Sequence, residues 1–214
     1  SGTLSAALGD GETVRIYDGG TFLGAATVSG TSWSYSDSRT LSNGQSVSYS
    51  ARVADAAGNQ SSAGSVYSAT IDTAAPSKTA AVTSITDNVG IITGTVASGS
   101  RTDDTSLELS GTLSAALGAG ETVRIYDGGT LLGAATVSGT SWSYSDSRSL
   151  SNGQAVSYSA RVADAAGNES SAGSVYSATI DTSAPNVAVA ITGISDDTGT
   201  SPSDFITKDT SLTI

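Results

Sequence analysis

The chain contains one long segment twice. Residues 1–73 return as residues 110–182, an offset of 109, and the two copies differ at five positions. The five pairs are Asp10/Ala119, Phe22/Leu131, Thr40/Ser149, Ser46/Ala155 and Gln60/Glu169. A period of this length exceeds that of a solenoid unit and fits one whole β-sandwich domain. We therefore expect each period to fold as a unit of its own, within a longer array of such units.

Within one period, apolar and polar residues alternate, which is typical of strands with one buried face. The segment 155–164 shows the pattern best, with one face formed by Val156, Tyr158, Ala160 and Val162. Asp127-Gly128-Gly129 predicts a hairpin turn whose two central residues have positive φ. No segment has a helical period, and the abundance of Ser, Thr and Val disfavours helix.

The strands expected in the second period number seven. They are Thr79–Ile85, Thr105–Leu113, Thr122–Tyr126, Leu131–Ser138, Ser141–Ser145, Ala155–Asp164 and Gly173–Asp181. Seven short antiparallel strands in about 100 residues indicate an immunoglobulin-like sandwich. The predicted fold is therefore all-β, with tandem immunoglobulin-like seven-stranded β-sandwich domains.

Two short proline-containing segments mark the domain boundaries. Asp72-Thr73-Ala74-Ala75-Pro76 and Asp181-Thr182-Ser183-Ala184-Pro185 each follow a predicted strand, and proline blocks its continuation. These Asp-Thr-x-Ala-Pro linkers place a complete domain at residues 73–182. Residues 1–72 are then a domain without its first strands, and residues 183–214 are the first strands of a following domain.

The composition argues against several classes of function. The chain has no Cys and no His, which excludes disulfides, Cys-type zinc sites and His-based nucleophilic catalysis. Its 20 acidic and 9 basic residues give a net charge of −11, which repels nucleic acid. No apolar run approaches the length that spans a bilayer. We expect no enzyme, since a glycosidase would need two carboxylates across a cleft and the acids lie in turns.

Most of the acids lie at strand ends or turns, which points to calcium. Ca²⁺ takes six to eight oxygen ligands from carboxylates, amide side chains and backbone carbonyls, and loops at a domain end can supply them. The alternative for each Asp is a cap on its own turn. The candidate ligands are Asp72, Asp87, Asn88, Asp103, Asp104, Asp127, Asp164, Asn168, Asp181, Asp196, Asp197 and Asp209.

Seven antiparallel strands distribute these candidates between two sites. At the leading end, a junction site would use Asp72, Asp164 and Asn168, with Glu121 nearby. At the trailing end, where Asp127 and Asp181 also fall, a second site would use Asp87, Asn88 and Asp104. The tail counterparts are Asp196, Asp197 and Asp209, and because Lys208 stands at the place of Asp103, that residue is a weaker candidate.

The few aromatic residues leave a binding module as the alternative function. The alternation turns Trp33 and Trp142 inward, so we expect them in the core rather than on a sugar-binding surface. A glycan- or protein-binding module that uses loops or a sheet face would need exposed aromatics, and the candidates are Tyr17, Tyr126, Tyr67 and Tyr176.

Three groups of residues resemble a known family of repeats. They are Thr122–Gly129 (TVRIYDGG), Val162–Asn168 (VADAAGN) and Asp181–Pro185 (DTSAP). Together with Ile85–Gly90 and Ile194–Gly199, they resemble the bacterial Ig-like repeats of giant RTX-type adhesins and biofilm-associated surface proteins. The resemblance covers the whole chain.

The resemblance implies an extracellular structural role at the bacterial cell surface. Such an extender region is exported by type I secretion, is stiffened by Ca²⁺ and projects an adhesive tip for cell adhesion and biofilm formation. Its partners are the neighbouring repeats of the same protein. The domain phase adds two alternatives: residues 186–214 of one chain complete the truncated domain of another, or the chain is a fragment of a longer protein.

Overall fold

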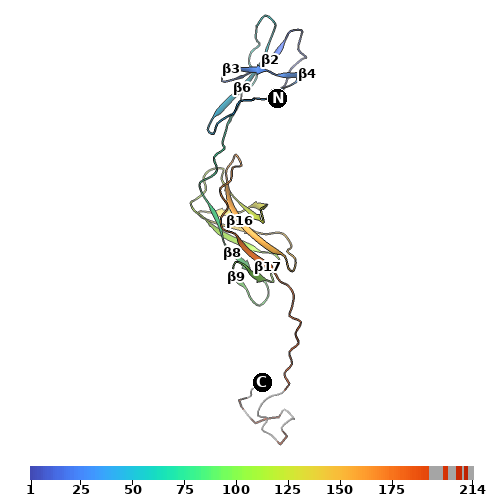
Figure 1. The fold of residues 1–214 in the computed structure, drawn as a ribbon, viewed down its shortest axis with the longest axis vertical. Helices are drawn as coiled ribbons and strands as arrows, with labels where there is room; N and C mark the ends of the chain where they lie inside the picture. The colour runs from blue at the N-terminus through green and yellow to red at the C-terminus, as the bar shows by residue number, and fades with distance from the viewer. Residues whose placement is uncertain (193–199, 202–205, 209, 212–214) are drawn as a thin grey trace.

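The computed structural model describes residues 1–192, 200–201, 206–208 and 210–211. Within these residues the chain forms 17 strands, and no helix is long and apolar enough to cross a membrane. The strands gather into two units that follow one another along the long axis of the molecule (Figure 1). We call residues 1–72 the N-terminal unit and residues 73–182 the central unit.

The central unit contains two five-stranded sheets. One has the order β14-β15-β11-β8-β9 and the other β10-β17-β16-β12-β13. The strands are β8 (Ala80–Asp87), β9 (Gly94–Val96), β10 (Ser100–Thr102), β11 (Glu108–Leu113), β12 (Thr122–Asp127), β13 (Thr130–Ala134), β14 (Thr136–Ser138), β15 (Ser141–Ser145), β16 (Ala155–Ala163) and β17 (Tyr176–Ile180). All neighbours pair antiparallel except β10 and β17, which are parallel.

The core of the central unit lies between the two sheets, as the alternation predicts. β16 buries Val156, Tyr158, Ala160 and Val162, and β12 contributes Val123 and Ile125. The opposite sheet supplies Ile85, Leu109 and Trp142. Burial of such side chains contributes about 25 cal/mol per Å² of apolar surface, so this two-sided core is the main source of stability.

The hairpin and the burial of Trp142 are confirmed, whereas Trp33 is only half-buried and the strand count is wrong in two places. Gly128 and Gly129 both have positive φ between the paired residues Asp127 and Thr130. The predicted strand 131–138 is two strands, since the chain leaves one sheet after β13 and joins the other as β14. β9 and β10 were not predicted because three-residue strands carry too little alternation to be recognised.

The N-terminal unit has the same arrangement with fewer strands. Its strands are β1 (Gly2–Thr3), β2 (Thr13–Asp18), β3 (Thr21–Ala25), β4 (Thr27–Ser29), β5 (Ser32–Ser34), β6 (Ser46–Ala54) and β7 (Tyr67–Thr70). They form sheets of order β1-β5-β4 and β3-β2-β6-β7. Each strand sits 109 residues before its counterpart in the central unit, and no strand of the described residues occupies the position that β8 has there.

Candidate metal centre

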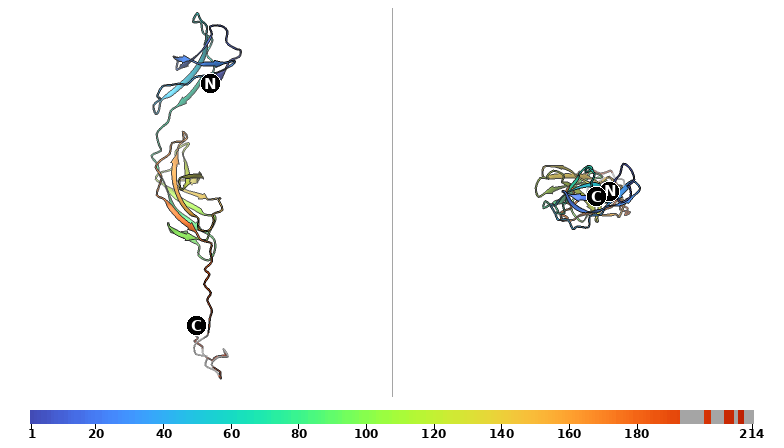
Figure 2. Two further views of the ribbon diagram at one scale, coloured as in Figure 1. Left: turned by 45° about the vertical axis from the view of Figure 1, so that its right-hand side comes forward. Right: turned by 90° about the horizontal axis from the view of Figure 1, so that it is seen from above.

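The strand directions carry the predicted ligands to opposite ends of the central unit. β8, β12 and β17 run away from the N-terminal unit; β8 ends at Asp87, β12 ends at Asp127, and Asp181 follows β17. β16 runs the other way and ends next to Asp164. The ribbon views show these two ends along the long axis (Figures 1 and 2). The strand topology therefore separates these acids into a group at the leading end and a group at the trailing end, as expected.

At the trailing end, Asp87 and Asp104 are joined through a buried threonine. The hydroxyl of Thr102 donates to Oδ2 of Asp87 at 2.6 Å and accepts from the backbone N–H of Asp104 at 3.1 Å. The backbone N–H of Asn88 donates to Oδ2 of Asp104 at 3.2 Å. Two of the three residues of the predicted second site thus contribute carboxylates to one connected group, and the third contributes its backbone.

Both carboxylates of this group are buried without a cationic partner among the described residues. Asp104 is 1% exposed and Asp87 is 8% exposed. Their remaining oxygens accept from the backbone N–H of Ser106 and of Val89, and no salt bridge reaches either side chain in the described part of the chain. Buried carboxylates are costly unless they are paired or bind a cation, so this pair is the best-fitting place for one.

Asp103 and Asp181 border a hollow beside this group. The hollow measures about 270 Å³ and is also lined by Asp87, Thr102 and Arg101. Asp103 packs against Gly90, where a side chain would overlap its carboxylate. Asp181 is paired with Arg101, whose Nη1 lies 2.8 Å from Oδ2. Asp103 forms no salt bridge within the described residues, whereas the charge of Asp181 is balanced by Arg101.

Asp127 belongs to a different network, in which the positive charge comes from an arginine side chain and not from a metal ion. Arg148 contacts Asp127 Oδ2 at 2.9 Å and Asp146 Oδ2 at 2.6 Å, and Tyr158 donates its hydroxyl to Asp146 at 2.6 Å. Oδ1 of Asp127 accepts from the backbone N–H of Ser157 at 2.7 Å. These contacts account for both oxygens of Asp127.

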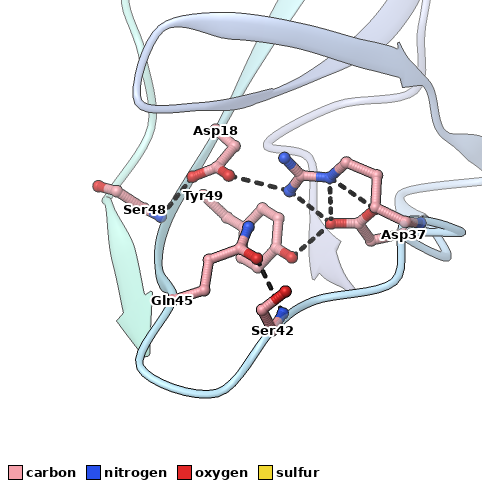
Figure 3. A network of polar contacts seen from close by, with 7 residues as sticks. Asp18, Asp37, Ser42, Gln45, Ser48 and Tyr49 are labelled. Carbon is pink, nitrogen blue, oxygen red and sulfur yellow. Dashed lines mark hydrogen bonds and ion pairs between the residues drawn. The ribbon is translucent and has the colours of Figure 1, made fainter. Parts of the chain in front are cut away.

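The N-terminal unit repeats this network with the same residue types (Figure 3). Arg39 bridges Asp18 and Asp37, and Tyr49 donates to Asp37 at 2.6 Å. Hydrogen bonds from Arg39, then from Tyr49, hold the pKa of Asp37 well below its usual range. The network is therefore a structural feature of each repeat.

At the leading end, Asp164 closes its own turn. Its Oδ1 accepts from the backbone N–H groups of Ala166 and Asn168, both at 2.9 Å, and its Oδ2 accepts from Asn168 Nδ2 at 2.9 Å. The hydrogen bond from the Asn168 side chain lowers the pKa of this carboxyl, with further help from the turn amides. Both oxygens are used by the turn, which is the capping role stated above as the alternative to calcium.

Asn168 also reaches the linker. Its Nδ2 donates to the backbone oxygen of Asp72 at 3.1 Å, while Oδ1 of Asp72 accepts from the backbone N–H of Ala74 at 3.0 Å. Glu121, expected nearby, is paired with Lys78 at 2.5 Å. The structure brings the predicted junction residues together, and it joins them by protein hydrogen bonds.

Among the described residues, no three acidic, histidine or cysteine side chains are grouped as a metal ion would require. Asp196, Asp197 and Asp209 lie outside the described residues.

Sequence reasoning missed Thr102 and the Asp146–Arg148 pair. A threonine between two acids carries no signal of its own, whereas the Asp-Ser-Arg run occurs in both copies, at residues 37–39 and 146–148, and could have been noticed. In the comparisons with known proteins, no family model and no curated protein matches the chain.

Proposed function

We propose that this chain is a stretch of structural extender from a secreted bacterial surface adhesin. Its role is mechanical: tandem sandwich units, without catalytic activity, hold an adhesive tip away from the cell. The observation that carries the proposal is the near-identity of two units that follow one another along one axis (Figure 2). Near-identical copies serve spacing, because a repeated spacer needs no specialised surface.

The junction supports a stiff connection. The nine residues between β7 and β8 are all that separates the two units, and Asn168 anchors this linker through the backbone of Asp72. A side chain of the central unit thereby limits the bending of the segment that enters it. Short, anchored linkers favour an extended array over a flexible one.

Calcium at the trailing end is the second part of the proposal. Asp87 and Asp104 are the acids that suit a hard cation best, because both are buried, neither forms a salt bridge within the described residues, and each carboxylate oxygen has a further lone pair. Asp103 borders the hollow beside them. Asp164 fits less well, because it is only half-buried and its carboxylate already accepts three hydrogen bonds from its own turn. When bound, the ion would offset carboxylate repulsion and tie the end of β8 to the segment after β10.

A distance measurement tests the stiff junction. The chain has no Cys, so Thr31→Cys and Thr140→Cys place spin labels at matched exposed positions of the two units without further changes. We expect a narrow distance distribution that Asn168→Ala broadens. Asn59→Ala is the matched control, because Asn59 closes the same turn in the N-terminal unit. A distribution as broad as that of a flexible linker would contradict the extender.

Thermal unfolding tests the calcium site separately. Extracellular Ca²⁺ modules bind with a Kd of about 10⁻⁴–10⁻³ M, so 10 mM Ca²⁺ should raise the Tm of the central unit by about 10 °C over EDTA. Mg²⁺ should have little effect. Asp104→Asn should remove the shift, and Asp164→Asn should keep it. If Ca²⁺ and EDTA give the same Tm, the ion is excluded while the extender stands.

A further inference from the structure

Two arginines of the N-terminal unit have no acidic partner. Arg15 and Arg52 form no salt bridge within the described residues, whereas every other arginine of the chain forms at least one. They lie directly opposite each other on β2 and β6, and opposed residues of an antiparallel pair share a face. Val14 and Ile16 of β2 are buried, so the arginines project from the outer face of the sheet, away from the core. Two adjacent positive charges without a counter-charge mark a place for an anion.

The central unit shows which group fits between these arginines. The equivalent Arg124 and Arg161 share one acid: Nη1 of Arg124 lies 2.9 Å from Oε1 of Glu169, and Nε of Arg161 lies 3.8 Å from Oε2. Tyr126 donates its hydroxyl to Oε1 of the same carboxylate. The hydrogen bond from Tyr126, followed by that from Arg124, lowers the pKa of Glu169, although burial opposes it. The two arginines and the tyrosine therefore form a site for one carboxylate, which the central unit fills with its own side chain.

The N-terminal unit keeps the three donors and lacks the carboxylate. The donors there are Arg15, Arg52 and Tyr17, and the acid is replaced by Gln60, one of the five differences between the copies. A glutamine amide carries no charge. Arg52 donates through Nη1 to the backbone oxygen of Ser61 at 3.1 Å, which leaves its other N–H groups for a ligand. The set of donors that binds a carboxylate in one unit is thus open in the other.

A second difference between the copies places an aromatic ring beside these donors. Phe22 stands where the central unit has Leu131, and it is 44% exposed. Cζ of Arg15 lies 4.2 Å from the centre of the Phe22 ring, and the ring of Tyr17 lies 5.6 Å from it. Such stacking uses the flat face of the guanidinium and leaves its N–H edge for a carboxylate. The donors therefore border an exposed aromatic ring.

We propose that this face of the N-terminal unit binds a sugar acid, with its carboxylate held by Arg15, Arg52 and Tyr17 and its ring packed beside Phe22. A hexuronate of an acidic polysaccharide has both parts, a planar carboxylate and an apolar C–H face that suits an aromatic ring. An acidic peptide offers the carboxylate without the ring. Glu169 closes the same place in the central unit, so only one of the two copies carries the site. The proposal depends neither on calcium nor on the extender role.

Titration of the full chain with trigalacturonate tests the site, with the NMR signals of the arginine Nε–H groups as readout. We expect saturable shifts at Arg15 and Arg52, with a Kd of about 1 mM or tighter. The trimethyl ester has the same rings without the charges and should cause no such shifts. At about 0.15 M salt, repulsion from acids more than about 8 Å away is largely screened.

Exchanges between the two copies provide matched variants. Gln60→Glu should weaken binding by about tenfold or more, because the new acid occupies the donors. Glu169→Gln together with Leu131→Phe should create a second site in the central unit. Ala119→Asp is the charge control, since it adds the same charge where the N-terminal unit has Asp10, and binding should persist. Each exchange introduces a residue that the other copy already contains at that place, so folding should be preserved.

Three results would overturn the proposal. They are the absence of saturable shifts with trigalacturonate, equal shifts with its ester, and unchanged binding in Gln60→Glu. A hexaglutamate peptide serves as a further probe. If it binds as tightly as the sugar acid, the ring makes no contribution and the site belongs to an acidic protein partner instead.

Discussion

At the scale of single residues, identical side chains behave differently in the two units. Tyr158 is fully buried, and burial, followed by its hydrogen bond to Asp146, raises its pKa. Burial also raises the pKa of Asp146, but hydrogen bonds from Arg148 and Tyr158 outweigh it, so the pKa lies below its usual value. The matching Asp37 and Tyr49 are half-buried. The same network of two aspartates, an arginine and a tyrosine therefore contributes more to the stability of the central unit.

Asp146→Asn should destabilise the central unit by about 2–3 kcal/mol at neutral pH, since it removes hydrogen bonds to a buried charge. A carboxyl with a depressed folded pKa stabilises above its unfolded value of about 3.9, and this contribution is lost as the pH falls through the folded pKa. The difference in unfolding free energy between wild type and variant should thus shrink as the pH falls below about 4. Urea unfolding followed by Trp142 fluorescence measures it, with Asp37→Asn as control. A difference that stays constant with pH would contradict the assignment.

At the scale of elements, β8 completes the core of the central unit. It pairs with β11 and β9 in its own sheet and packs across the core on β16 and β17. The loop before β17 passes so close to it that Gly173 leaves no room for a side chain. The glycine is required by the approach of the two backbones, since its φ is not in the left-handed region.

Gly173→Ala should therefore destabilise the central unit by about 1–3 kcal/mol, the usual cost of overpacking. The midpoint of urea unfolding, followed by Trp142, should fall accordingly. Gly153→Ala is a useful comparison: its φ is 80° and nothing lies near its Cβ, so any loss there comes from backbone strain alone. An unchanged midpoint for Gly173→Ala would mean that the loop moves aside freely.

At the scale of the whole molecule, the two units differ in how much of their core is covered. Val162 and Ala160 are completely buried, whereas the equivalent Val53 and Ala51 are half-buried. The linker joins the units with few contacts between them, so each unit should unfold by itself. The chain should then lack a single cooperative transition.

We expect two unfolding transitions at low chain concentration, the N-terminal unit first. Trp33 and Trp142, the only two tryptophans, report on the two units separately. Trp33→Phe should remove the early fluorescence change and Trp142→Phe the late one. Coincident transitions at every concentration would show that the units are coupled through the linker.

The sequence by itself determined the class of fold, the boundaries of the repeat and the ends at which the acids gather. These depend on alternation, turn residues and strand direction, which are local or follow from counting strands. The Asp-Gly-Gly turn and the inward face of β16 are of this kind, because each is specified by neighbouring residues.

Only the tertiary structure decided which acidic side chains have their charge balanced by an arginine and which are held by hydrogen bonds alone. Arg148 reaches Asp127 from 21 positions away, and Thr102 joins Asp87 to Asp104 across the ends of two strands. It also showed a difference in burial between the two copies, since Ala160 and Val162 are completely buried while the equivalent Ala51 and Val53 are half-buried. Burial depends on which strands lie opposite, and that is a property of the assembled sheets rather than of the repeated sequence.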